Sequence, residues 1–318
     1  MTYKRYADTL KEKYGEKVYK IPVNLPVTCP NRDGTCGKGG CTFCGDVGIG
    51  YEMLDTKITI EDQLKQNIEY IGKRYKARKF IAYLQNFSNT YMPLETFKEV
   101  LSQIHHKDLV GISISTRPDC INEAYLKAIH SWQKETGYDV CIELGLQTMN
   151  YHTLAKINRG HGLSEYLDAV LRIKAYGFSI CTHLILNLPW DNLDDVIENA
   201  KLMSVLNMDY IKLHALYITK GTKMGRQYEA GEFEMISMEE YEERVITFLR
   251  YLSPNIVIQR IIGRAPEEYT LFANWNTSWW KIHDEIIEKM EANHWKQGDL
   301  CNYLNGKAVK GFVTKEEA

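Results

Sequence analysis

Apolar runs of strand length alternate with amphipathic stretches of helix length along most of the chain. The strand-like runs occupy residues 17–23, 79–87, 109–116, 139–147, 179–188 and 210–218. The helix-like stretches occupy residues 60–75, 94–104, 122–136, 164–176 and 192–206, and several begin at capping residues such as Asn122, Ser164 and Asn192. Repeated strand–helix units with short loops predict an α/β fold, in which helices cover the outside of a parallel sheet.

The last third of the chain carries a shorter pattern. It predicts a helix near residues 237–251, a strand near 255–260 and an aromatic segment over 275–295 that includes Trp279 and Trp280. A helix that packs these tryptophans on the sheet is favoured over a surface that stacks on a nucleobase. We therefore expect an N-terminal extension (residues 1–16), a barrel core (17–220) and a C-terminal extension packing on the barrel (221–318).

Composition narrows the class of protein. The first 20 residues are charged and rich in tyrosine, and they lack the apolar segment of about 7–15 residues that a signal peptide needs. No apolar run is long enough to cross a bilayer, so we expect a soluble, cytoplasmic protein without a membrane partner. The net charge of −2 argues against a uniformly basic nucleic-acid binder but permits a local basic patch.

A glycine-rich loop over residues 29–44, here called the cysteine loop, contains Cys29, Cys36, Cys41 and Cys44. Glycines let the backbone turn tightly enough to direct several thiolates toward one point. A structural zinc site prefers two close pairs of ligands, but Cys29 and Cys36 are seven positions apart. An iron–sulfur cluster can use three cysteines and leave one iron open. Spacing therefore favours iron–sulfur over zinc, with a disulfide least favoured.

Polar residues also recur where the predicted strands end. In parallel α/β barrels, functional groups gather at the carboxyl ends of the strands. Each such residue alone is explained as a turn former or a cap, but their repetition around one rim favours a site there. The strand-end residues include Gln85, Asn86, Ser88, Thr90, Ser115, Thr116, Arg117, Asp119, Glu143, Gln147, His183, Asn187, Lys212, His214 and Lys220.

Several motifs together resemble the radical S-adenosylmethionine (SAM) superfamily. They are Cys-Thr-Phe-Cys at 41–44, Glu-Leu-Gly-Leu-Gln-Thr at 143–148, Asn-Arg-Gly-His at 158–161 and His-Leu-Ile-Leu-Asn-Leu-Pro at 183–189. The chain resembles the branch that includes the Elongator catalytic subunit, the tRNA methylthiotransferases and the oxygen-independent coproporphyrinogen oxidase, over nearly all of residues 15–300. More narrowly, the motifs at 29–35, 116–120 and 211–214 resemble a bacterial family of similar length, some of whose members are linked to modification of the tRNA wobble uridine.

The resemblance implies a partial (β/α)6 TIM-like barrel of radical SAM type with a short C-terminal α/β extension. It also implies a 4Fe-4S cluster held by Cys29, Cys41 and Cys44, with S-adenosyl-L-methionine on the open iron. Cys36 departs from the family pattern and is interpreted as a nonligand. Phe43 is expected to pack beside the adenine.

The resemblance further implies the contacts to S-adenosylmethionine. Arg159 suits the carboxylate of its methionine moiety, and the alternative for this residue is a surface ion pair. Gln85 and Asn86 replace a glycine-rich strand end that meets the amino group in relatives. The full set of expected cofactor contacts is Phe43, Gln85, Asn86, Ser115, Glu143, Gln147, Arg159 and His183, and the candidate catalytic residues are Lys212 and His214.

The leading functional hypothesis is conversion of a 5-carboxymethylaminomethyl group on a tRNA wobble uridine to 5-aminomethyl, with the base flipped into the barrel mouth. Expected partners are tRNA, an external one-electron donor of flavodoxin or ferredoxin type, and a downstream tRNA methyltransferase. A methylthiotransferase would need a further N-terminal domain and an Elongator-type acetyltransferase a longer C-terminus, so neither is expected. The alternatives are a radical SAM enzyme acting on a small metabolite or peptide, and a noncatalytic tRNA-binding protein with structural zinc.

Two basic clusters are candidate tRNA contacts, with solvated surface as the alternative. They comprise Lys4, Arg5, Lys11, Lys13 and Lys17 near the N-terminus, and Lys73, Arg74, Lys76, Arg78 and Lys79 before the second predicted strand.

Overall fold

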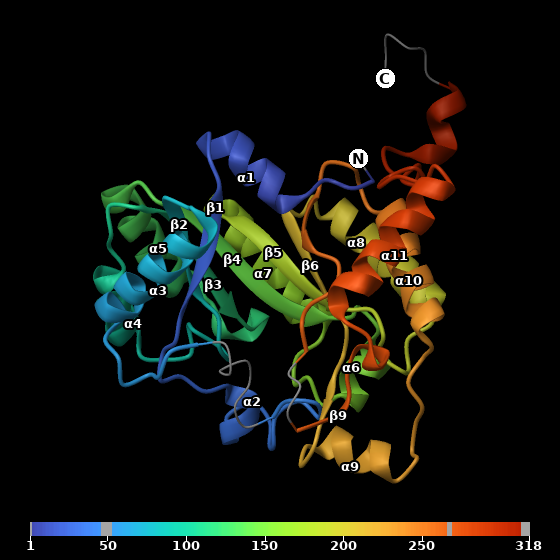
Figure 1. Cartoon of the computed structure of the whole chain (residues 1–318), viewed down its shortest axis with the longest axis horizontal. Coiled ribbons are helices and arrows are strands. Elements are labelled where there is room, and N and C mark those ends of the chain that lie inside the picture. The colour runs from blue at the N-terminus through green and yellow to red at the C-terminus, as the bar shows by residue number, and fades with distance from the viewer. Residues whose placement is uncertain (1, 46–52, 266–268, 313–318) are drawn as a thin grey trace.

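The computed structural model describes residues 2–45, 53–265 and 269–312 (Figure 1). Its centre is a seven-stranded sheet in which every neighbouring pair is parallel and the strand order is β1-β2-β3-β4-β5-β6-β8. The strands are β1 (Val18–Val23), β2 (Lys79–Leu84), β3 (Leu109–Thr116), β4 (Asp139–Gln147), β5 (Ser179–Ile185), β6 (Tyr210–His214) and β8 (Val257–Arg260). This sheet confirms the expected α/β fold of partial-barrel type and adds a seventh strand, β8, from the C-terminal extension.

Helices follow most of the strands and cover the outer face of the sheet (Figure 1). The α-helices of the described residues, including those at the two ends of the sheet, are α1 (Tyr6–Tyr14), α2 (Pro30–Asp33), α3 (Ile60–Tyr75), α4 (Leu94–Gln103), α5 (Glu123–Thr136), α6 (Tyr151–Lys156), α7 (Leu163–Ala175), α8 (Leu193–Val205), α9 (Lys223–Glu229), α10 (Met238–Tyr251) and α11 (Trp279–Ala292). Short 3-10 turns span Pro118–Cys120, Asn274–Asn276 and Lys307–Phe312.

Local capping explains where several helices begin. Asn122 and Asn192 accept backbone N–H bonds at the starts of α5 and α8, as predicted. The predicted cap Ser164 is wrong, because α7 begins directly after Gly162, whose backbone N–H donates to the Glu165 carboxylate at 2.8 Å. This carboxylate bond fixes the start of the helix without a hydroxyl cap.

The two faces of the sheet differ in polarity. On β4, Val140, Ile142 and Leu144 belong to the apolar core between sheet and helices. Glu143, which alternates with them, contacts side chains from β1, β5 and β6 and therefore points into the barrel interior, here called the lumen. The hydrophobic effect thus holds the outer face, while the inner face remains available for polar side chains.

The predicted strand over residues 210–218 is two elements. The chain leaves the main sheet after His214, and Ile218–Thr219 forms β7, which pairs in antiparallel fashion with β9 (Thr270–Phe272). The buried Asn187 side chain accepts from the Leu216 N–H at 2.5 Å and donates to the Leu216 carbonyl at 3.3 Å. These two bonds replace the ladder bonds that the departing backbone loses.

The aromatic segment packs differently from the prediction. Helix α11 buries Ile282, Ile286 and Met290 against the core, whereas the side chains of Trp279 and Trp280 are 41% and 57% exposed. The expectation that this helix packs its tryptophans on the barrel is therefore wrong for these two residues. The apolar stripe of the helix is supplied by aliphatic side chains four residues apart.

Helix α1 lies across the amino-terminal ends of the strands, opposite the ends that α2, α6 and α9 cover (Figure 1). The Tyr14 hydroxyl donates to Asp139 at the start of β4, and the Lys79 ammonium at the start of β2 donates to the Tyr14 carbonyl at 2.9 Å. The Tyr6 ring packs edge-on against Tyr210 at the start of β6, with 5.1 Å between ring centroids. The N-terminal segment thus covers the far end of the lumen.

Across the described residues, no helix combines the length and the apolar character that a membrane span requires.

Candidate active site

The cysteine loop follows β1 at the carboxyl end of the sheet, where each predicted ligand sulfur faces an arginine. Cys41 is buried and Cys29 and Cys44 are half-buried, whereas Cys36 is exposed. A nearby guanidinium lowers the energy of an anionic metal–thiolate group. In the free protein, burial raises the pKa of the Cys44 thiol, and Arg32 opposes that shift. Distances from each arginine Nη1 to the facing Sγ are 4.0 Å for Arg117 and Cys29, 3.5 Å for Arg159 and Cys41, and 3.4 Å for Arg32 and Cys44.

Arg117 is held rigidly in this position. Its Nε and Nη2 donate to the two carboxylate oxygens of Asp119 at 2.8 and 2.6 Å, and its Nη1 also donates to the Arg159 carbonyl at 2.9 Å. Burial alone would raise the pKa of Asp119, but the hydrogen bonds and charge of Arg117 outweigh it and lower that pKa. The two parallel bonds to Asp119 fix the Arg117 guanidinium beside the cysteine loop. Its bond to the Arg159 carbonyl connects it to the second arginine of the site.

The Asn-Arg-Gly-His motif anchors the loop. Asn158 Nδ2 donates to the carbonyls of Lys38 and Gly40 at 3.1 and 2.7 Å, and Asn31 Nδ2 donates to the Asn158 carbonyl at 2.6 Å. Gly160 has φ +75°, and a Cβ there would lie 2.4 Å from Asn31 Oδ1. Glycine is therefore required for the motif to approach the loop this closely.

Glu143 is the centre of a buried polar cluster inside the barrel. Its Oε1 accepts from the Lys20 ammonium, and its Oε2 accepts from the Tyr83 hydroxyl at 2.9 Å, the His183 Nε2 at 2.7 Å and the Lys212 ammonium at 3.3 Å. The carboxylate side chain is fully buried. Burial alone would raise the pKa of Glu143, but Lys20 and Lys212 lower it well below its usual value.

Two histidines extend this cluster toward β8. Arg260 Nη2 lies 2.7 Å from His214 Nδ1, His214 Nε2 lies 3.3 Å from His183 Nδ1, and His183 Nε2 lies 2.7 Å from Glu143. Because a guanidinium only donates, His214 must accept at Nδ1, and donation then runs from Arg260 through both imidazoles to the carboxylate. Burial lowers the pKa of His183 to about 4 and that of His214 well below its usual value, so both rings are neutral near pH 7.

We call this set the lumen network. It comprises Lys20, Tyr83, Glu143, His183, Lys212, His214 and Arg260.

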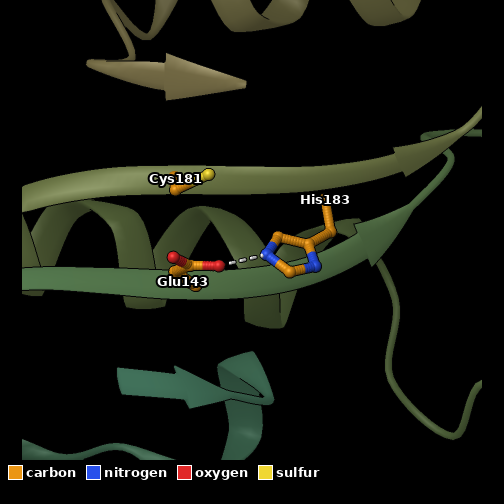
Figure 2. A group of neighbouring side chains, drawn as sticks. All are labelled: Glu143, Cys181 and His183. Carbon is orange, nitrogen blue, oxygen red and sulfur yellow. Dashed lines mark hydrogen bonds and ion pairs between the residues drawn. The ribbon is translucent and has the colours of Figure 1, made fainter. Parts of the chain in front are cut away.

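Cys181 lies beside this network, and Figure 2 shows it on β5 near Glu143 and His183. Their potential ligand atoms all lie within 4.8 Å of one another, a spacing that would permit a metal ion. The charges do not fit a cation, because Lys20 and Lys212 already bind the carboxylate oxygens and would repel it. This part of the lumen is therefore a polar network and not a metal centre.

The remaining predicted contacts lie at the carboxyl ends of β2, β3 and β4 or in the cysteine loop. Ser115 donates to the Tyr83 hydroxyl at 3.2 Å, and Gln147 adopts φ +80° at the end of β4 beside Gly145. Gln85 is half-buried and Asn86 is buried. Phe43 packs against a small apolar cluster whose buried members are Leu154, Ile157, Ile185, Leu188, Leu216, Ile218 and Met224.

Arg159 is buried, so the alternative of a surface ion pair is wrong. Its Nη2 donates to the Gly145 carbonyl at 2.6 Å, which connects the cysteine loop to the end of β4. Sequence reasoning missed Arg32, Lys20, Tyr83 and Arg260, and it identified Arg117 only as one of the polar residues that end the third predicted strand. Because functional groups gather at the carboxyl ends of strands in such barrels, the sequence does contain a signal for Arg260, which ends the predicted strand over 255–260. The same signal applies to Arg117, which follows the run over 109–116.

These residues fit the cofactors that the motifs imply. Three thiols with cationic neighbours match an anionic cluster with three protein ligands. Among the described residues, Arg159 Nε is a buried donor without a partner and Asn86 Oδ1 is a buried acceptor without one. A carboxylate and an amino group, the two ends of the methionine moiety of S-adenosylmethionine, would satisfy both atoms.

Comparison with known proteins agrees with this site. Residues 26–203 match the family described as the Radical SAM superfamily, and residues 208–292 match the Radical_SAM C-terminal domain. The chain is 35% identical over 304 residues to the uncharacterized protein YtqA of Bacillus subtilis, covering 94% of this chain and 93% of that protein. It is 26% identical over 295 residues to a tRNA uridine(34) acetyltransferase of Methanocaldococcus infernus, covering 78% and 52% respectively.

A solved structure of the archaeal Methanocaldococcus infernus Elp3 with an N-terminal deletion aligns with a TM-score of 0.65. The alignment covers 88% of this chain and 64% of that one at 18% identity, which shows a common fold. The superfamily match spans more than half of the 318 residues and includes the cysteine loop. The chain therefore belongs to the radical SAM superfamily, whose enzymes bind a 4Fe-4S cluster and S-adenosyl-L-methionine.

Proposed function

We propose that this radical SAM enzyme acts on the wobble uridine of tRNA and converts a 5-carboxymethylaminomethyl group to 5-aminomethyl. The observation that carries the choice of tRNA is the similarity to the tRNA uridine(34) acetyltransferase, which extends over 78% of the chain. The polar lumen below the cysteine loop supports a substrate with charged and hydrogen-bonding groups.

When bound, the cluster and S-adenosylmethionine would supply radical chemistry able to abstract a hydrogen atom from an unactivated carbon of the substrate. Cys29, Cys41 and Cys44 would hold the cluster, and Arg159 and Asn86 would orient the methionine moiety through their unpaired polar atoms. Helix α1 covers the opposite end of the lumen, which limits access of water to the reacting carbon.

The mouth of the barrel would receive the RNA. Exposed Lys220 and Lys223 lie beside the start of α9, and this helix is joined to the cysteine loop by a bond of 2.8 Å from the Met224 N–H to the Thr42 carbonyl. The basic cluster around Lys76 and Arg78 instead lies just before β2, at the end of the sheet that α1 covers. We therefore favour the lysines of the mouth as phosphate contacts.

We also propose two protein partners for this enzyme. An external one-electron donor of flavodoxin or ferredoxin type would reduce the cluster, and a separate tRNA methyltransferase would act on the aminomethyl product.

Mass spectrometry of tRNA nucleosides from a strain that lacks this protein tests the proposal. Accumulation of 5-carboxymethylaminomethyluridine, restored to wild type by the intact gene and not by a Cys41→Ala variant, is the expected result. The anaerobically reconstituted protein should also form 5-aminomethyluridine on tRNA isolated from that strain. An unchanged nucleoside profile together with no conversion in vitro would eliminate this function.

A radical SAM enzyme for a small metabolite or peptide is the second candidate. The buried, charged lumen network favours it, because such a network can bind a small polar molecule without RNA. Absence of measurable tRNA binding by the intact protein would shift the preference to this candidate. Membership in an enzyme superfamily leaves the zinc-binding, noncatalytic alternative without support.

A further inference from the structure

The lumen network contains more positive than negative charge. Lys20, Lys212 and Arg260 are cationic, whereas Glu143 is the network's carboxylate. The two histidines between them are neutral, as the donation from Arg260 to His214 requires. Two positive charges are therefore left without a counter-ion inside the network, and buried charges are normally paired.

Glu143 cannot supply the missing negative charge. It already accepts from four side chains, and the Lys20 ammonium occupies its Oε1. The Lys212 ammonium lies 3.3 Å from Glu143 Oε2, which also accepts from Tyr83 and His183. The closer partner of Lys212 is the neutral Tyr83 hydroxyl at 2.7 Å. The Lys212 side chain is 10% exposed. In such a setting, burial lowers the pKa of Lys212 to about 8.

Arg260 also has unused donors. Its Nη2 meets the imidazole of His214, and among the described residues its Nε is buried without an acceptor. The Nε2 of the neighbouring Gln259 is a second buried donor without a partner, while its Oε1 accepts from Lys20 at 2.9 Å. A Cβ at Gly263 would lie 2.8 Å from Arg260 Cζ, so glycine allows the backbone to pack against the guanidinium.

Lys212 and Arg260 are neighbours across the sheet. They are register partners on the adjacent parallel strands β6 and β8, directly after an irregularity in the register and near the carboxyl ends of both strands. Neighbouring strands lie about 4.8 Å apart. A carboxylate between them would neutralise one of the two excess charges and accept the unused N–H groups.

We propose that Lys212 and Arg260 bind an anionic group of the substrate, which in the proposed reaction is the carboxylate of the 5-carboxymethylaminomethyl group. This assignment rests on the proposed function for the identity of the anion, but the charge balance of the lumen stands without it. Lys212 and Arg260 thereby determine specificity, because a substrate without the carboxylate leaves both charges unpaired.

The first experiment compares two tRNAs. Binding to the anaerobically reconstituted full-length protein is measured for one tRNA that carries 5-carboxymethylaminomethyluridine and for the same tRNA with 5-aminomethyluridine. The wild type should prefer the carboxylate by at least tenfold, and Arg260→Gln should reduce the preference to within about twofold. Arg260→Lys keeps the positive charge but loses the paired N–H donors of the guanidinium, so it should retain part of the preference for the carboxylate. Exposed Arg226→Gln is the matched control and should keep the full preference.

A second experiment needs no RNA. Acetate is titrated against the holoenzyme, with acetamide as the neutral match, and the imidazole NMR signals of His183 and His214 are followed. Acetate should shift these signals and acetamide should not, and Arg260→Gln should weaken the response at least tenfold. Circular dichroism and urea midpoints confirm that each variant folds.

The two proposals fail separately. An acetate response that Arg260→Gln removes, in a protein that makes no 5-aminomethyluridine, keeps the anion site and rejects the tRNA function. Conversion of tRNA by a protein that shows neither an acetate response nor a preference for the carboxylate keeps the function and rejects the anion site. A carboxylate preference that Arg260→Gln leaves unchanged also overturns the assignment of this arginine.

Discussion

Arg159 donates to the Cys41 sulfur at 3.5 Å and, through its other terminal nitrogen, to the Gly145 carbonyl at the end of β4. One side chain thus connects the expected cluster ligand with the strand that carries Glu143. A Cβ at Gly145 would lie 2.7 Å from Arg159 Nη2, so glycine is needed for this contact. The arrangement couples the position of the cysteine loop to the shape of the lumen.

We predict that Cys29→Ala, Cys41→Ala and Cys44→Ala each abolish cluster assembly and cleavage of S-adenosylmethionine. Each removes one of three thiolates, and none is spare. Cys36→Ala should retain most of both, because Cys36 is exposed. Iron content and absorbance near ~400 nm after anaerobic reconstitution provide the measurement. Loss of the cluster in Cys36→Ala, with retention in any of the other three, would overturn the ligand assignment.

Arg159→Ala should keep the cluster and weaken S-adenosylmethionine binding by about 1.5–3 kcal/mol, as expected for the loss of a charge-assisted bond to the carboxylate. Removing a cation and an N–H donor from the Cys41 sulfur should also make the cluster harder to reduce. A shift of tens of millivolts toward negative potential is expected, since about 59 mV is a tenfold change for one electron. Calorimetry and redox titration measure the two effects.

Arg172→Ala is the control for Arg159, because Arg172 pairs with Asp168 on the outer helix α7. Both its cofactor affinity and its potential should equal those of the wild type. If Arg159→Ala matches Arg172→Ala in both measurements, Arg159 has no role toward the cofactors.

Glu143→Gln should lower the free energy of unfolding by about 3–5 kcal/mol, because it leaves Lys20 and Lys212 buried without their carboxylate. Urea denaturation of the purified protein measures this loss. Glu95→Gln is the matched control, since Glu95 is 79% exposed in its pair with Lys98 and should cost less than about 1 kcal/mol. Equal losses in the two variants would contradict a central role for Glu143.

The sequence was sufficient to predict most of the fold but only part of the site. Periodicity located β3 and β4 with their observed bounds, because buried strands with alternating side chains have a strong signal. It did not separate β7 from β6, since the break depends on Asn187, a residue distant in the chain. Lys20 was missed for a similar reason: its partner, Glu143, lies on another strand, and no local pattern reports that contact.

Acid should destabilise the protein through the buried histidines. The folded-state pKa of His183 is about 4, below the ordinary value of about 6.5, so between these values the unfolded chain binds a proton that the folded chain does not. Stability therefore rises with pH in this window and is lost as pH falls from about 6.5 to about 4, by about 3 kcal/mol for His183. Glu143, whose pKa is lowered, adds a further loss below about 4.5.

His183→Gln keeps a nitrogen that can donate to Glu143 but does not titrate. Urea midpoints at several pH values should therefore fall less steeply for this variant than for the wild type between pH 6.5 and pH 4. Replacing the exposed His152 by glutamine should leave the wild-type slope. Identical slopes for His183→Gln and the wild type would show that His183 does not carry this pH dependence.

The location of the tRNA interface gives the last prediction. Lys220→Glu with Lys223→Glu should weaken tRNA binding and flatten the dependence of log affinity on log salt by about 0.9 for each phosphate that the protein no longer neutralises. Lys76→Glu with Arg78→Glu reverses the same charge at the opposite end of the sheet, beside α1, and should have a smaller effect. Cleavage of S-adenosylmethionine without tRNA should be unaltered in both pairs, because none of the four residues contacts the cysteines or the lumen network in the described structure.

Filter binding over a salt series measures the affinity. A larger loss in the Lys76 and Arg78 pair would move the RNA to the α1 end of the molecule, and equal wild-type affinity in both pairs would remove both surfaces from the tRNA interface.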